Sequence, residues 1–156
     1  MKLFTRWLPV CLALIFIPAG CTKDQTSEPA PSPFSGILET DSSCTIIGGD
    51  TTDFLPRPTL SGPPQGTPSN YSLIMACPNP VPGDTTTIEF QIPVTDSVWL
   101  EAFVVPSAAP VATILRERLP AGVYRILWGF SGANRIYRVQ MSTQNGFSSY
   151  GDVEFR

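Results

Sequence analysis

The 156-residue sequence predicts an all-β fold, with a β-sandwich that follows an N-terminal leader and a proline-rich tether. Two observations support this prediction. From Tyr71 onward, short apolar runs are separated by turn-forming residues, as in antiparallel strands with one buried face. Outside the leader, no stretch keeps the apolar spacing of an amphipathic helix over three turns.

The leader, residues 1–20, has the three parts of a secretory signal. Lys2 and Arg6 give a positive start, Leu8–Ile17 is a short apolar run, and Pro18-Ala19-Gly20 leads to Cys21. The apolar run is shorter than the roughly 20 residues that cross a bilayer. We therefore expect the segment to direct secretion and to be removed.

The end of the leader resembles a bacterial lipobox, in which small residues precede a cysteine that becomes lipidated. The resemblance implies that Cys21 is the first residue of the mature protein and that acyl chains on it anchor the protein to a membrane. The alternative is an ordinary secreted protein that is cut nearby and keeps Cys21 as a thiol. Because Thr22 rather than Asp follows Cys21, we expect a bacterial outer-membrane or cell-surface location.

Residues 21–69 are predicted to be an acidic, flexible tether rich in Pro, Ser, Thr and Gly. This segment has eight of the 17 prolines, and six acidic residues against two basic ones. Such a composition buries too little apolar surface to offset the entropy lost on ordering. The apolar stretch 43–47, followed by Gly48-Gly49, is interpreted either as an extra strand or as part of the tether.

The first four predicted strands of the domain at 71–156 are apolar or alternating runs. Leu73–Cys77 is a short apolar run, and Thr87–Ile92 alternates apolar and polar residues so that its apolar side chains share one face. Val98–Val104 repeats that alternation, and Val111–Leu115 is a further apolar run with β-branched residues.

The last three predicted strands follow in the same way. Tyr124–Trp128 and Tyr137–Met141 alternate around polar residues, and Val153–Phe155 closes the chain. Pro120-Ala121-Gly122 and Asn145-Gly146 are turn sequences between neighbouring runs. Seven strands in about 86 residues is typical of an immunoglobulin-like β-sandwich.

Two motifs mark this domain. The first is Cys77-Pro78-Asn79-Pro80-Val81, followed by a Thr-rich alternating strand. The second is Leu119-Pro120-Ala121-Gly122 with a strand that ends at Trp128, followed by Tyr137 in a later strand. Together they resemble the C-terminal sandwich domains of type IX secretion cargo and the immunoglobulin-like domain of the flagellar hook-capping protein. The resemblance covers residues 71–156 and implies a structural or interaction module.

The chain also departs from the sorting domains of that family. Val81 stands where the family has an aromatic residue, and the chain ends at Arg156 without the basic finish that sorting domains often have. A lipid anchor would make a second attachment signal redundant. We therefore interpret the domain as an interaction module, with a type IX sorting or anchoring module as the alternative.

Cys44 and Cys77 are the cysteines that remain once the leader is removed and Cys21 is lipidated. In an oxidising envelope, an even pair predicts a disulfide. Closing a loop of this length would stabilise the fold by roughly 3–4 kcal/mol in the chain-entropy model. The alternative is two separate thiols.

Aromatic residues of the predicted strands fall on both faces. Trp128 and Tyr137 lie on the inward alternation of their strands and are predicted to be core residues. Trp99 and Phe103 fall on the outward face with Glu101, and an exposed aromatic pair indicates a contact surface. The alternative is that the tether folds back over them.

The composition argues against several function classes. The sequence has no His, which removes the commonest general base and zinc ligand. A net charge of −3 argues against a nucleic-acid surface. Asp50 and Asp53 match no full calcium loop, and no phosphate-binding loop or carboxylate dyad is found. We expect no catalytic residues, no cofactor and no metal site, and an envelope protein or glycan as the partner.

Overall fold

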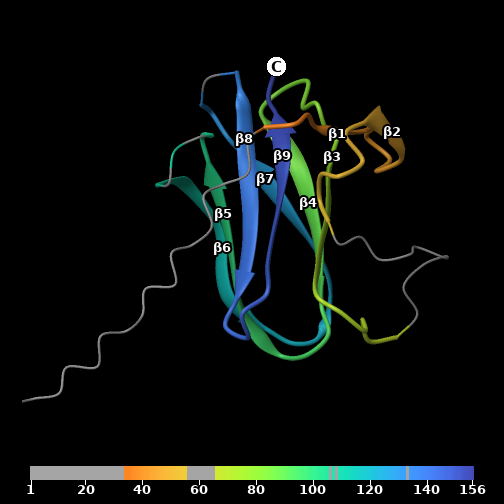
Figure 1. The fold of residues 1–156 in the computed structure, drawn as a ribbon, viewed down its shortest axis with the longest axis vertical. Helices are drawn as coiled ribbons and strands as arrows, with labels where there is room; N and C mark the ends of the chain where they lie inside the picture. Colours follow the sequence, from red (N-terminus) through yellow and green to blue (C-terminus); the bar gives the residue numbers. More distant parts are fainter. Residues whose placement is uncertain (1–33, 56–65, 106, 108, 133) are drawn as a thin grey trace, which may run out of the picture. The chain divides into compact units, whose positions relative to one another are not determined.

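The computed structural model describes residues 34–55 and 66–156, except for 106, 108 and 133 (Figure 1). The predicted leader and Cys21 lie outside these residues. Across them the fold is all-β, as predicted, and no helix long and apolar enough to cross a membrane is found among them. The nine strands are β1 (Leu38–Thr40), β2 (Ile46–Gly49), β3 (Ser72–Cys77), β4 (Thr85–Ile92), β5 (Asp96–Phe103), β6 (Pro110–Leu119), β7 (Gly122–Gly129), β8 (Ile136–Thr143) and β9 (Ser148–Glu154).

Seven of these strands form two antiparallel sheets that pack face to face. One sheet has the order β3-β4-β7 and the other the order β6-β5-β8-β9. Figure 1 shows the two layers, with β8 and β9 in the nearer one. The packed faces exclude solvent completely at Ile88 and Phe90 of β4 and at Val98 and Leu100 of β5. This apolar layer is the core that positions every other feature of the domain.

Alternation along the strands explains which side chains fill the core. In β5, each second residue from Asp96 onward is buried, and the residues between them are half-buried on the other face. In β4, Ile88, Phe90 and Ile92 are fully buried, as the alternating run predicts. Their neighbours are held in place by pairing with β3 on one side and β7 on the other.

An aromatic cluster fills one end of the core. Trp128 and Tyr137 are 5% and 2% exposed, which confirms the prediction that both are core residues. The Trp128 ring meets Phe155 edge-on, with ring centroids 5.1 Å apart, and Phe130 meets Tyr137 with centroids 4.5 Å apart. Such edge-to-face pairs add stability beyond the burial of their area.

The prediction of a flexible tether over 21–69 is wrong for residues 34–55. These residues form the small β1-β2 sheet and pack on β3 and β9. The side chains of Leu38 and Phe54 are completely buried, and Phe54 occupies the space left by the missing side chain of Gly151 in β9. The average composition of the segment conceals the few apolar residues that hold it in place.

Strand bounds near this segment also differ from those predicted. The extra strand considered at 43–47 is β2, which begins at Ile46, while Cys44 lies in the preceding turn with a φ of 63°. The last strand was predicted over Val153–Phe155, but β9 begins at Ser148. Its first half is polar, and its pairing with β8 rather than any apolar alternation makes it a strand.

Candidate interaction surface

The outer face of the four-stranded sheet has the predicted contact residues. Because Val98, Leu100 and Ala102 point into the core, the side chains between them point away from it. Register then identifies their outward neighbours on β6, β8 and β9. We call this set the outer face: Ser97, Trp99, Glu101, Phe103, Thr113, Arg116, Arg118, Arg138, Gln140, Ser142, Ser148, Tyr150 and Asp152.

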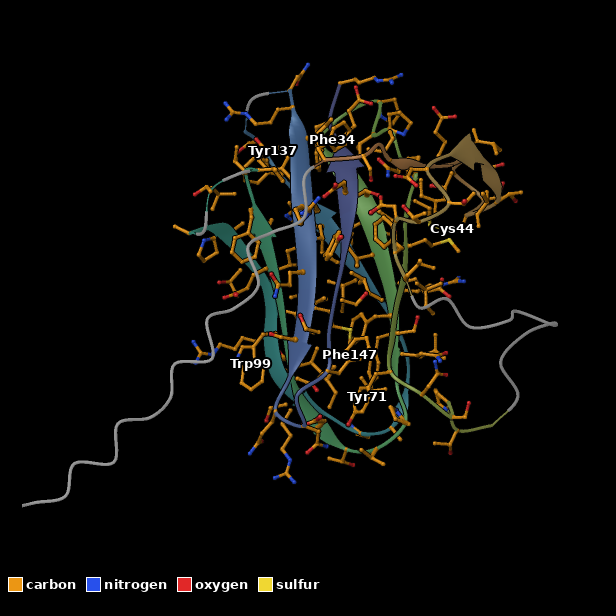
Figure 2. All side chains as sticks on the ribbon, viewed as in Figure 1. Phe34, Cys44, Tyr71, Trp99, Tyr137 and Phe147 are labelled. Carbon is orange, nitrogen blue, oxygen red and sulfur yellow. A yellow bond between two sulfur atoms is a disulfide. The ribbon has the colours of Figure 1, made fainter. Side chains whose placement is uncertain are left out.

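Three aromatic side chains lie on the outer face. Trp99 and Phe103 are half-buried, and Tyr150 is 38% exposed. Figure 2 shows Trp99 toward the end of the sandwich where Tyr71 and Phe147 stack, and those two rings have centroids 5.4 Å apart. The outward positions of Trp99 and Phe103 agree with their strand alternation, and residues 34–55 pack on β3 and β9 rather than on β5.

A buried ion pair fixes one side of the outer face. Arg138 donates from Nε to Oδ1 of Asp152 and from Nη2 to Oδ2, each at 2.8 Å. Both side chains are almost completely buried, and the guanidinium lies 4.2 Å from the centroid of the Tyr150 ring. The hydrogen bonds that Arg138 donates to the Asp152 carboxylate raise the pKa of Arg138 above its ordinary value. This two-point pair orients Tyr150 and leaves its own charges neutralised.

Two arginines on β6 are not neutralised in this way. Arg116 lies directly across from Trp99, and Arg118 lies across from Ser97. Both are exposed, and within the described ranges neither has a carboxylate in ion-pair distance. Only the register of β5 and β6 places this pair beside Trp99, so from the sequence alone these arginines are interpreted as ordinary solvated residues.

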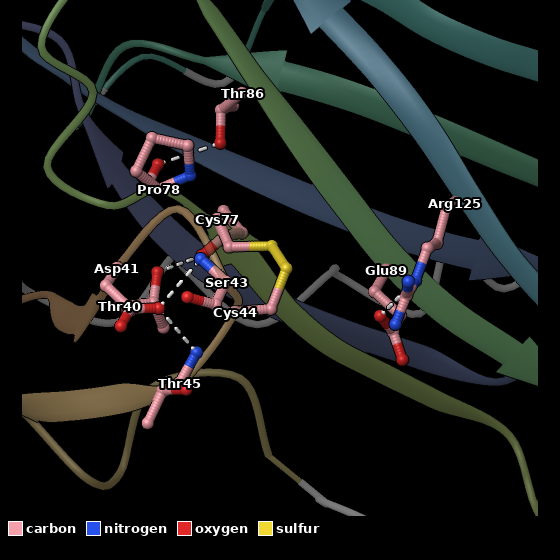
Figure 3. The surroundings of a disulfide bond; sticks show 11 residues. Thr40, Asp41, Ser43, Cys44, Thr45, Cys77, Pro78, Thr86, Glu89 and Arg125 are labelled. Carbon is pink, nitrogen blue, oxygen red and sulfur yellow. Dashed lines mark hydrogen bonds and ion pairs between the residues drawn. A yellow bond between two sulfur atoms is a disulfide. The ribbon is translucent and has the colours of Figure 1, made fainter. Parts of the chain in front are cut away.

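The structure joins Cys44 and Cys77 in a disulfide (Figure 3), with their Cα atoms 5.1 Å apart. The turn that contains Cys44 is shaped by Asp41, whose Oδ1 accepts hydrogen bonds from the amides of Ser43 and Thr45 at 2.9 Å. This Asx-type turn presents Cys44 to the end of β3. The bond therefore ties the β1-β2 sheet to the sandwich.

The Pro78-Asn79-Pro80 motif joins three parts of the chain. Asn79 is completely buried, and its Nδ2 donates to the carbonyls of Leu38 and Asp152 at 2.9 Å. Its Oδ1 accepts from the amide of Glu154 at 3.0 Å. The peptide bonds before both prolines are cis. The motif thus covers the free edge of β9 and connects it to β1, which is a structural role.

The Leu119-Pro120-Ala121-Gly122 motif forms the turn between β6 and β7. The hydroxyl of Tyr124 donates to the carbonyl of Pro120 at 2.6 Å, which closes the turn. A side chain at Gly122 would come within 3.4 Å of the Tyr124 ring, so glycine lets the ring lie against the turn. This motif also has a structural role.

Asp53 caps the backbone at the edge of β9. Its carboxylate accepts hydrogen bonds from the amides of Leu38 and Asp152, and it is 4% exposed. Burial raises the pKa of Asp53 to about 7, with a contribution from the charge of Asp152. Within the part of the chain that the structure describes, no group of three His, Cys, Asp or Glu side chains is arranged to hold a metal ion.

Comparisons of this chain with protein-family models, with curated proteins and with solved structures gave no match. The candidate surface is therefore described by its own chemistry: three aromatic side chains, two unneutralised arginines, and short hydroxyl and amide side chains between them.

Proposed function

We propose that this chain is a non-catalytic bacterial envelope lipoprotein, anchored through Cys21 at the outer membrane or cell surface. It displays an immunoglobulin-like sandwich as an interaction or scaffolding module. The observation that supports this proposal most directly is the outer face, where Trp99, Phe103 and Tyr150 stand on the solvent side of a sheet. A sheet does not need such residues there for its own core, and they are typical of contact surfaces.

The strand order supports an immunoglobulin-like arrangement. Two antiparallel sheets of three and four strands pack over a common core, and β4 and β5 are consecutive in the chain but lie in different sheets. Such crossings of the chain from one sheet to the other between consecutive strands are a feature of seven-stranded sandwiches. The disulfide of this chain differs from that of antibody domains, because it ties β3 to the preceding β1-β2 sheet and not one main sheet to the other.

Within the described residues, the path of the N-terminal segment leaves one side of the sandwich open to a partner. Residues 34–55 pack on β3 and β9, which are edge strands of the two sheets and lie beside each other. The other two edges, β6 and β7, are therefore on the opposite side. Trp99 on β5 and Arg116 on β6 lie toward this open side, away from the strands where the anchored end of the chain attaches.

Two experiments in intact cells test this proposal. Cys21→Ser should release the protein from the membrane fraction and abolish acyl labelling, and unchanged membrane association would contradict the anchor. A photo-crosslinking residue at Phe103 should capture a partner that is lost in a Trp99→Ala variant. A matched control is Leu127→Ala, which removes an apolar side chain that is 73% exposed on the other sheet. If Leu127→Ala abolishes the crosslink to the same extent as Trp99→Ala, the assignment of the outer face as the contact surface is wrong.

The second candidate is a type IX sorting module, favoured by the presence of both motifs at the separation expected from the resemblance. In the structure, Asn79 and Gly122 hold the fold together. A reporter that has its own secretory signal peptide and is fused to residues 34–156 separates the candidates, because this range includes the β1-β2 sheet and the disulfide. Delivery of the reporter across the outer membrane would favour sorting, and retention would favour the interaction module.

A further inference from the structure

We propose that the outer face binds an anionic polysaccharide, with Arg116 and Arg118 holding its carboxylates and Trp99 stacking on its sugar rings. This inference rests on the proposed function, because it names the chemical class of the partner for the same surface. Three properties of the described residues support it: unneutralised positive charge, aromatic faces, and a surrounding row of short polar side chains.

The charge of the binding region is set by β6. Arg116 and Arg118 are alternate residues on one strand, so both side chains lie on the outer face and their Cα atoms are about 7 Å apart. Neither has an ion pair within the described ranges, whereas Arg138 on the same face is fully engaged by Asp152. Two neighbouring guanidinium groups can each bind a carboxylate at two points.

The acidic residue of the outer face that lies outside the Arg138–Asp152 ion pair is Glu101, and it is not directly across from either arginine. Trp99 is paired with Arg116 on β6 and with Ser142 on β8. Glu101, the next outward residue of β5, is paired instead with Thr113 and Gln140. Positive charge is therefore concentrated at the Trp99 end of the outer face. This distribution is complementary to a polymer with repeated carboxylates rather than to a cationic partner.

The aromatic residues fit sugar rings. Trp99 and Phe103 are four residues apart on β5, which places them about 13 Å apart along an extended strand. The apolar C–H face of a sugar ring packs on an aromatic ring, and a chain of several sugars would contact both. Ser97, Ser142 and Gln140 lie between or beside them, and their hydroxyl and amide groups can bond sugar hydroxyls.

The mixture of side chains favours a polysaccharide over an acidic protein segment. The centre of a protein–protein interface is depleted of charge and is continuous in its apolar area. Here Arg116 stands directly beside Trp99, and Glu101 lies between Trp99 and Phe103 on the same face. Aromatic rings separated by polar groups suit a ligand that itself alternates apolar ring faces with hydroxyl and carboxylate groups.

The test uses the full chain with Cys21→Ser, and polygalacturonate as the probe in calorimetry and in affinity gel electrophoresis. We expect binding that weakens with added salt, because the contacts are charged and exposed. The double variant Arg116→Gln plus Arg118→Gln should lose about tenfold or more in affinity, as should Trp99→Ala. The control double variant, Arg125→Gln plus Arg135→Gln, removes the same charge elsewhere and should bind like the parent.

Three outcomes would overturn the inference: no binding to polygalacturonate, equal loss in the control double variant, or equally tight binding of polyglutamate, which would indicate an acidic protein partner. These outcomes are distinct from failure of the proposed function. If Phe103 crosslinks to a protein in cells while polygalacturonate does not bind, the proposed interaction module is supported and the assignment of a polysaccharide ligand is wrong. If no partner of any kind is captured and no probe binds, both fail.

Discussion

Replacing Asn79 with alanine should destabilise the sandwich strongly, because one buried amide serves three backbone groups at the edge of β9. The Nδ2 group donates to the carbonyls of Leu38 and Asp152, and Oδ1 accepts from the amide of Glu154. The side chain is completely buried, so bulk water does not reach these partners in the native fold. Alanine at this position leaves two carbonyls and one amide without this partner.

The expected loss follows from the number of groups affected. A buried backbone group left unsatisfied costs about 1–3 kcal/mol. With partial relaxation around the smaller side chain, three such groups should cost about 3–5 kcal/mol, which is a large share of the roughly 5–15 kcal/mol that stabilises a small domain. The backbone hydrogen bonds between Asn79 and Thr40, at 2.7 and 3.1 Å, do not depend on the side chain and should remain.

An Asn79→Asp variant tests the same contacts through pH. The carboxyl keeps the acceptor for Glu154 but places its second oxygen against the carbonyls of Leu38 and Asp152, so its pKa in the folded state should be raised. Since the folded pKa lies above the unfolded one, stability is highest below about pH 4 and falls as pH rises toward the folded pKa. The loss in Asn79→Ala should show no such dependence on pH beyond that of the parent.

Urea unfolding followed by tryptophan fluorescence measures both variants, since Trp128 is 5% exposed in the native state and becomes solvated on unfolding. The matched control is Asn134→Ala, because Asn134 is exposed and its side chain makes no hydrogen bond within the described ranges. The control should stay within roughly 0.5 kcal/mol of the parent. A loss below roughly 1 kcal/mol for Asn79→Ala would refute the assigned role, as would an Asn79→Asp variant as stable as the parent at neutral pH.

Three further perturbations follow from the same contacts. Cys44→Ser should lower the free energy of unfolding by about 3–4 kcal/mol by freeing the closed loop, and a reductant should lower the Tm of the parent but not of the variant. Because burial raises the pKa of Asp53 to about 7, the native state binds a proton that the unfolded state has lost, and the stability of the parent should fall as pH rises from about 4 to about 7. In the Asp53→Asn variant, the urea midpoint of unfolding should depend less on pH than in the parent. An unchanged pH dependence would show that a group other than Asp53 titrates. Gly151→Ala should cost about 1–3 kcal/mol or more in the same assay because its Cβ would overlap the Phe54 ring, and a neutral effect would contradict that packing.

Much of the core could be predicted from the sequence, because strand alternation is a local property of the chain. The apolar residues of β4 and β5 repeat every second position, so their buried faces follow directly from the order of residues. Trp128 and Tyr137 were assigned to the core by the same rule, and both are buried. The ends of the strands do not follow from this rule, since pairing with a neighbour extends a strand beyond its apolar part.

The folding of residues 34–55 could not be predicted in this way, because it depends on contacts between residues distant in the chain. Phe54 is buried only because Gly151 provides the space, and Asp53 caps the amide of Asp152, 99 residues later. Local composition is rich in Gly, Thr and Asp and therefore predicts a loop. The polar first half of β9 was missed for the same reason, since its partner strand decides its conformation.

The candidate surface was predicted only in part. Alternation along β5 places Trp99 and Phe103 outward, but it says nothing about the neighbouring strand. Two register shifts between β5 and β6 determine which β6 residue faces each of them. The position of Arg116 beside Trp99 follows from that register, so a count of charges along the sequence could not distinguish this arginine from an ordinary solvated one.

The docked segment also changes what the proposed anchor can reach. A tether of residues 21–69, fully extended, would span at most roughly 170 Å, whereas the chain from Cys21 to Phe34 spans at most roughly 45 Å. Beyond Phe34 the chain is held by β1 and by the disulfide, so it adds no further reach. A domain anchored within that distance can bind only components at or near the surface of its own membrane. A polysaccharide attached to that surface satisfies this requirement, since it brings many equivalent carboxylates within reach of Arg116 and Arg118.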